Sequence, residues 1–133
     1  QMRLQDWTMR YAKLCAERRD TPFAWGSHDC CLWAADVVQA ITGQDFAAPH
    51  RGTYDDATGA ARLIKRLGGL REIACAALGD AIGPRLASVG DVVLISHGGR
   101  ELLAVCNGME AFAPGPDGLV AVGMDAALAA WRV

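Results

Sequence analysis

Two adjacent cysteines stand where a loop gives way to an apolar helix. The loop ends at Ser27 or Asp29, either of which suits the N-cap position, and Cys30 then opens the helix. The unpaired N–H groups and the positive dipole end of a helix start stabilise a thiolate. Cys30 is therefore the candidate nucleophile or soft ligand of this chain.

A cysteine nucleophile needs a base within hydrogen-bond reach, and the chain has three histidines. His97 falls in the turn after the first expected strand and is the candidate base, although turn histidines are often simply solvated. His28 precedes Cys30 by two residues, where a loop or capping role is the simpler interpretation. His50 lies in a loop beside Pro49 and has the weakest claim to a site role.

Metal binding is the other chemistry that these residue types allow. The candidate soft ligands are His28, Cys30, Cys31 and Cys106. Consecutive cysteines point to different faces of a helix, and the five cysteines form no CxxC pair. We therefore expect no metal and no cofactor. A contact between Cys30 and Cys106 without a metal is an alternative that the sequence does not decide. The odd number of cysteines and the absence of an export signal favour a reducing compartment.

Composition narrows the class of protein. The chain has 133 residues, 52% of them hydrophobic, and a net charge of −2. These values predict one packed domain over residues 1–133 and argue against disorder. No basic patch or stripe indicates nucleic-acid binding, and no apolar run reaches the length of about 20 residues that a membrane span needs. The amphipathic stretch 4–19 does not read as a signal peptide, so we expect no membrane insertion.

The first half of the chain predicts helices. Helical spacing of apolar residues indicates helices over about 4–18, 30–43, 57–67 and 71–78, with an irregular crossing loop at 44–54. Asp55 or Asp56 is the expected cap of the third helix, which ends at Gly68-Gly69. The apolar residues expected to face inward from this helix are Ala57, Ala60, Ala61, Ile64 and Leu67.

The second half changes to short apolar runs with a period of two. Strands are expected over 92–95, 101–106, 109–113 and 119–122, with Asn107-Gly108 as the strongest hairpin turn. Asp125 is expected to cap a terminal helix that ends at Trp131. Helices followed by an antiparallel sheet predict an α+β fold.

These motifs resemble those of the NlpC-type, papain-like cell-wall cysteine peptidases. Asp29-Cys30-Cys31 matches the segment around the family's nucleophile, and Gly90-Asp91-Val92-Val93 matches a strand that follows it. The resemblance implies a papain-like fold, with a helical N-terminal half packed on a small antiparallel sheet. It also implies a cysteine endopeptidase that acts on the stem peptides of peptidoglycan.

A narrower resemblance covers nearly all of the chain. It is similar to small NlpC-like proteins encoded among the tail-tip genes of long-tailed phages and prophages. The motifs that carry this resemblance are Trp-Gly-x-x-Asp-Cys, Arg-Gly-Thr-Tyr, Gly-Pro-Asp-Gly-Leu and the final Ala-x-x-Ala-Trp-Arg-Val. It implies a protein that is made in the bacterial cytoplasm and located in the phage tail of the virion. Other tail-tip proteins would be its partners, with peptidoglycan as a further one.

The chain departs from the peptidase pattern at two positions. Laid on that pattern, the base histidine falls at Leu102 and the polar residue that orients it falls at Phe112. A leucine cannot accept the proton of a thiol. We therefore expect a structural component of a phage tail tip whose peptidase site has degenerated. The alternatives are an active endopeptidase that uses Cys30 with His97, and a tail assembly factor.

Overall fold

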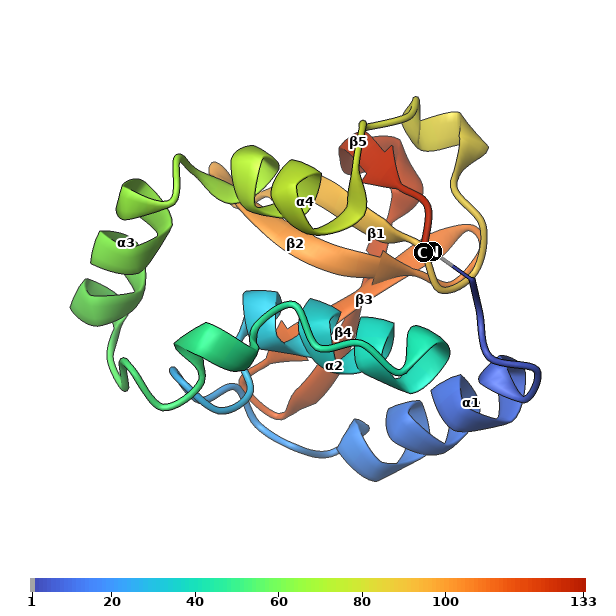
Figure 1. Cartoon of the computed structure of the whole chain (residues 1–133), viewed down its shortest axis with the longest axis horizontal. Coiled ribbons are helices and arrows are strands. Elements are labelled where there is room, and N and C mark those ends of the chain that lie inside the picture. The colour runs from blue at the N-terminus through green and yellow to red at the C-terminus, as the bar shows by residue number, and fades with distance from the viewer. Residues whose placement is uncertain (1) are drawn as a thin grey trace.

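The computed structural model describes residues 2–133, which form an α+β protein with its helices first and an antiparallel sheet after them (Figure 1). The α-helices of these residues are α1 (Trp7–Arg18), α2 (Cys30–Thr42), α3 (Ala57–Arg66) and α4 (Leu70–Leu78). The strands are β1 (Val92–His97), β2 (Arg100–Cys106), β3 (Glu110–Gly115), β4 (Gly118–Gly123) and β5 (Ala127–Trp131). Short 3₁₀ turns, η1 (Ala48–His50), η2 (Pro84–Leu86) and η3 (Met124–Ala126), lie between them.

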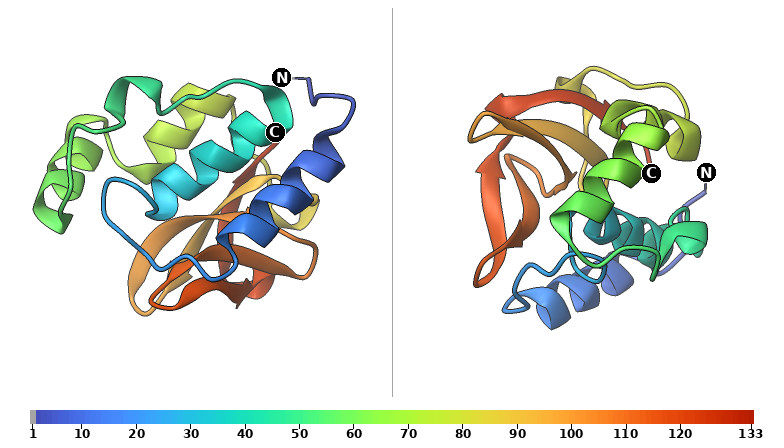
Figure 2. Two further views of the ribbon diagram at one scale, coloured as in Figure 1. Left: turned by 90° about the horizontal axis from the view of Figure 1, so that it is seen from below. Right: turned by 90° about the vertical axis from the view of Figure 1, so that its left-hand side faces the viewer.

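The sheet has the strand order β4-β3-β2-β1-β5, and every neighbouring pair is antiparallel. Each of the four strands expected from the sequence is present, and its ends differ from the expected ones by at most two residues. The strands curl strongly, and the helices gather on one side of them (Figure 2). Helix α2 contacts β2 and β3, and α4 contacts β1, β2 and β5. The coarse fold class predicted from the sequence is therefore confirmed.

Two helix boundaries are set by local capping. Asp29 caps α2 and Asp56 caps α3, each accepting a hydrogen bond from the backbone three residues later. Gly43 ends α2 in the left-handed conformation, with φ of 84°. These boundaries agree with the sequence analysis, as does the short fourth helix.

The expected terminal helix is wrong. Residues 127–131 form strand β5, which pairs with the free edge of β1 and places Val92 opposite Trp131. Trp131 is fully buried there. The alanine-rich sequence favours a helix locally, but pairing with β1 satisfies the backbone and buries the tryptophan, so tertiary structure overrides local preference.

The two faces of the sheet belong to different apolar clusters. Alternate residues of β1 and β2 face the helices, among them Val92, Leu94, Leu103 and Val105. The residues between them face a second cluster inside the curl of the sheet, among them Val93, Ile95, Ala104 and Cys106. This alternation decides which side chains can approach the start of α2.

The two ends of the described chain lie side by side (Figure 1). Arg3 donates from Nε to the carbonyl oxygen of Val133 at 2.7 Å and from Nη2 to Asp91 at 3.0 Å. The buried carboxylate of Asp91 also accepts the backbone N–H of Val133 at 3.0 Å. The segment before α1 is thereby tied to the sheet and to the end of β5.

Candidate functional site

The start of α2 is held by the carboxylate of Asp29, which is only 2% exposed. Oδ1 accepts the N–H of Leu32 at 3.0 Å, while Oδ2 accepts the N–H of Gly26 at 3.0 Å and the hydroxyl of Tyr54 at 2.6 Å. Burial and this hydrogen bond raise the pKa of Tyr54. Three donors from three segments therefore fix the loop that leads into Cys30.

Close backbone packing reinforces this arrangement. Gly26 has φ of 81°, and a Cβ at this position would lie 2.1 Å from the carbonyl oxygen of Tyr54. Only glycine allows the Trp25-Gly26 turn to approach the 51–54 segment so closely. The Arg-Gly-Thr-Tyr motif, which the sequence analysis used only for the family resemblance, thus supplies part of the scaffold around Cys30.

Cys30 lies in the first turn of α2, as the sequence predicts, and its sulfur is close to β2. A hydrogen bond from the Cys31 thiol is the main cause that lowers the pKa of Cys30, and the backbone N–H of Leu103 adds to it. Burial opposes the shift. The pKa of Cys31 is raised, chiefly because its thiol donates to Cys30 and is itself buried. The first proton to leave the pair therefore comes from Cys30.

The strand next to Cys30 corrects the position expected for the base. Leu103, not Leu102, faces the helices with its side chain fully buried, while Leu102 packs on the opposite face of the sheet. A shift of one residue exchanges the faces of a strand, and the resemblance alone does not fix that shift. Both positions carry leucine, so the side facing Cys30 is apolar in either case.

Phe112 lies on the helix-facing side of β3. Its side chain packs against the helix-facing cluster, and its carbonyl oxygen accepts the indole N–H of Trp33 at 3.0 Å. This position offers no polar side chain to orient a base. Leu103 and Phe112 therefore both present apolar side chains on the helix-facing side of the sheet.

The structure does not bring His97 to Cys30. His97 is exposed at the end of β1, and alternation along the strand places it on the face opposite to Leu94, the residue paired with Leu103. His97 is three residue steps along the strand from Leu94, a distance of about 10 Å. The imidazole would have to cross the sheet to reach the sulfur.

His28 is buried and engaged elsewhere. Its Nδ1 lies 3.1 Å from Nη1 of Arg18, and its ring meets that of Trp33 edge-on. Burial and the nearby Arg18 charge lower the pKa of His28. Its Nε2 is buried without a hydrogen-bond partner among residues 2–133. The histidine serves as a neutral packing group beside the loop rather than as a partner of Cys30.

The sequence analysis missed a chain of ion pairs beneath this loop. Asp36 accepts from Arg18 at 2.8 Å and from Arg51 at 2.7 Å, and Arg51 also binds Asp45 at 2.8 Å. A surface position on α2 would leave Asp36 solvated, yet its side chain is only 11% exposed. The helical periodicity gave no signal for this network, because its arginines come from α1 and from the 44–54 loop.

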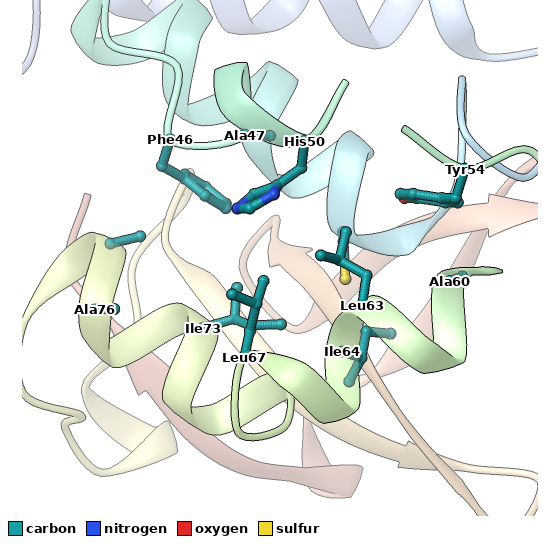
Figure 3. Close-up of a pocket in the computed structure, with 12 residues that line it drawn as sticks. Phe46, Ala47, His50, Tyr54, Ala60, Leu63, Ile64, Leu67, Ile73 and Ala76 are labelled. Atoms are coloured by element: carbon teal, nitrogen blue, oxygen red, sulfur yellow. The ribbon is translucent and has the colours of Figure 1, made fainter. Parts of the chain in front are cut away.

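A cavity opens on the other side of the helix start (Figure 3). It measures about 380 Å³ and lies between α3, α4 and the 46–54 segment. Most of its wall is aliphatic, and its residues are Cys31, Phe46, Ala47, His50, Tyr54, Ala60, Leu63, Ile64, Leu67, Ile73, Ala76 and Ala77. Cys30 thus faces the sheet while Cys31 faces the cavity.

The cavity also corrects the expected orientation of α3. Ala60 and Leu63 are buried, whereas Ala57 and Ala61 are exposed. The inward stripe is therefore rotated toward Leu63, because α3 covers this cavity instead of the sheet.

Within residues 2–133, no group of three or more His, Cys, Asp or Glu side chains is arranged to hold a metal ion. All five cysteines are free; Cys106 donates to the carbonyl oxygen of Gly108 and packs on the sheet face away from α2. Along the same residues, no helix has both the length and the apolar character needed to cross a bilayer.

The fold and the site define an α+β protein with a helix-start cysteine set against an antiparallel sheet. Residues 2–133 match the family described as Domain of unknown function (DUF6950), and the chain belongs to that family. No curated protein matches the chain.

Proposed function

We propose that this chain is a structural component of a phage tail tip, built on an NlpC-type fold whose peptidase site no longer works. The observation that carries the proposal is the apolar wall opposite Cys30. A cysteine peptidase needs an imidazole beside its sulfur and a polar group that orients the imidazole. Leu103 and Phe112 stand on the face where those groups would have to lie.

The arrangement of the helix start supports an NlpC-type ancestry. A capped helix presents its first-turn cysteine to the central strands of an antiparallel sheet, as the resemblance implies. Among residues 2–133, no histidine side chain hydrogen-bonds to Cys30, since His28 is engaged by Arg18 and His97 lies on the far face. A fold kept without these groups is expected to serve binding rather than chemistry.

The partners in this proposal are other tail-tip proteins, and the location is the virion. Pro116 and Asp117 are exposed at the tip of the β3–β4 hairpin, a segment suited to carry recognition on a rigid scaffold. A stable contact should bury at least about 1,000 Å² of total surface. We expect the contact to lie outside the Cys30 side of the molecule.

The test is a mass-spectrometric inventory of purified virions from a host that carries the gene. The proposal expects this chain in stoichiometric amounts. An Asp117→Lys variant should impair particle assembly while changing the free energy of unfolding by no more than about 0.5 kcal/mol. Infectious virions that lack the chain would contradict the proposal and favour a tail assembly factor.

One observation favours a second candidate, an endopeptidase acting on peptidoglycan stem peptides. The pKa of Cys30 is lowered, chiefly by its hydrogen bond with Cys31, and a lowered thiol pKa favours the thiolate that acts as a nucleophile. The discriminating experiment incubates the purified chain with peptidoglycan and follows released muropeptides. Our proposal expects no cleavage. Cleavage that is lost in both Cys30→Ser and His97→Ala would replace it with the enzyme.

A further inference from the structure

From the cavity beside Cys31, we infer a binding site for a small apolar ligand that carries one hydrogen-bonding group, with the apolar body against α3 and the polar group at His50. The inference does not depend on any chemistry at Cys30. It rests on the size of the cavity, on the packing of α3 and on the His50 imidazole of the wall, which makes no side-chain hydrogen bond among residues 2–133.

The size of the cavity suits a small molecule. Its volume of about 380 Å³ lies within the range of about 300–1,000 Å³ that is typical of ligand pockets. At about 30 Å³ for each water in the liquid, this volume equals roughly a dozen waters. A ligand of about ten non-hydrogen atoms would therefore fill most of it.

Within residues 2–133, helix α3 makes few contacts with the other helices and strands, and its apolar face borders this cavity. It stands at one end of the molecule, away from the sheet (Figure 1). Both of its buried residues, Ala60 and Leu63, line the cavity, and Ile64 and Leu67 extend the same apolar wall. An amphipathic helix normally gains its stability by burying this face against another element. A ligand in the cavity would supply the missing contacts.

The polar groups of the wall point to a single anchor. The Tyr54 hydroxyl is already bound to Asp29, and the Cys31 thiol is only a weak hydrogen-bonding group. The His50 side chain makes no hydrogen bond to another part of residues 2–133, and it points into the cavity next to Phe46 (Figure 3). Mostly apolar pockets with one or a few placed polar groups are the usual form of small-molecule sites.

The experiment compares two probes of nearly equal size by NMR titration of the full chain. 4-Propylphenol has an apolar body and one hydroxyl group, whereas propylbenzene lacks the hydroxyl group. Both should give saturable shifts of backbone resonances from cavity residues, with 4-propylphenol binding more tightly. A hydrogen bond of ordinary net strength predicts about a fivefold difference.

Two variants test the position and the anchor. Ala76→Phe places a ring in the cavity from an exposed position of its wall, and should weaken both probes at least about tenfold. Ala61→Phe, exposed on α3 and outside the cavity wall, is the matched control and should leave binding unchanged. His50→Leu should remove the advantage of the phenol while retaining the binding of propylbenzene.

The spectrum of each unliganded variant shows whether it is folded, so a failed fold is not mistaken for a failed site. A folded chain that gives no saturable shifts with either probe would overturn the inference. Equal binding by the wild type and by folded Ala76→Phe would overturn it as well. Loss of a peptidase or tail-tip role would leave these titrations unchanged.

Discussion

The two sides of the α2 start differ sharply although they belong to adjacent residues. On the Cys30 side, β2 closes against the helix, and the buried leucine Leu103 fills the space. On the Cys31 side, α3 stands off and leaves a cavity of about 380 Å³. The comparison teaches that two adjacent residues of one helix turn can face a closely packed strand and an open cavity, depending on the element that covers each side.

The difference arises from how each side is covered. The closed side is covered by a strand that pairs with β1 along most of its length and with β3 at Val105 and Cys106, so it cannot withdraw without breaking the sheet. The open side is covered by a helix attached through Gly68-Gly69, and both glycines have positive φ. Strand β2 is held in place by many long-range hydrogen bonds, whereas helix α3 is held by the short linkers at its ends.

The largest expected loss of stability comes from a substitution in the loop that leads into Cys30. Gly26→Ala would place a Cβ against the Tyr54 carbonyl in a left-handed backbone conformation, and should lower the free energy of unfolding by about 3 kcal/mol or more. Gly52→Ala is the matched control, because Gly52 has φ of 75° and open space around it. It should lose only about 1 kcal/mol. Urea denaturation measures both, and equal losses would refute the close approach.

Intermediate losses of stability are expected from removing one leucine on each side of the α2 start. Leu103→Ala removes a fully buried side chain and should lower the free energy of unfolding by about 3 kcal/mol. Leu63→Ala removes a side chain that already borders a cavity, so about half of that loss is expected. Chemical denaturation of both variants gives the ratio. A larger loss at Leu63 would mean that the cavity is collapsed in solution.

The smallest effect concerns pH. Burial lowers the folded-state pKa of His28, so below its ordinary pKa near 6.5 the unfolded chain binds more protons than the folded chain. The contribution of His28 to stability is therefore present above about pH 6.5 and falls as the pH drops toward the folded-state pKa. His28→Gln should lose less stability than the wild type between pH 7 and pH 5.

The control for this comparison is His97→Gln, since His97 is exposed at the hairpin. It should follow the wild-type pH dependence. The same slope for His28→Gln and the wild type would contradict the buried, neutral state of His28. Thermal melts across the pH range provide the measurement.

Local signals predicted the parts of the fold that local chemistry determines. Asp29 and Asp56 mark the helix starts because capping involves only the next three residues. Strand β5 was missed because its alanines form it only when β1 offers a free edge. The face of α3 was misjudged for a similar reason, since Leu63 turns inward only where Cys31 and Phe46 form the other wall.

The candidate site divides in the same way. The position of Cys30 follows from the cap beside it. Its neighbour on β2 depends on which residues of the strand face the helices, and the position expected from the sequence differed from the observed one by one residue. The Asp29–Tyr54 bond joins residues 25 positions apart, and the Arg18–Asp36–Arg51 network joins three segments. Periodicity does not report such contacts, because each partner looks like an ordinary surface residue on its own element.

The hydrogen bonds that join Arg3, Asp91 and Val133 bear on whether the segments of this chain can be placed in a different sequence order. Since Arg3 bonds directly to Val133, a short peptide could join the two ends without distorting either. The exposed Gly98-Gly99 turn between β1 and β2 offers a place to reopen the chain. Such a circular permutant would begin with β2 and end with β1, so the central strand pair would be assembled from the two extremes of the new chain. It should reach the same structure more slowly, because its most extensive strand pairing would have become its longest-range contact.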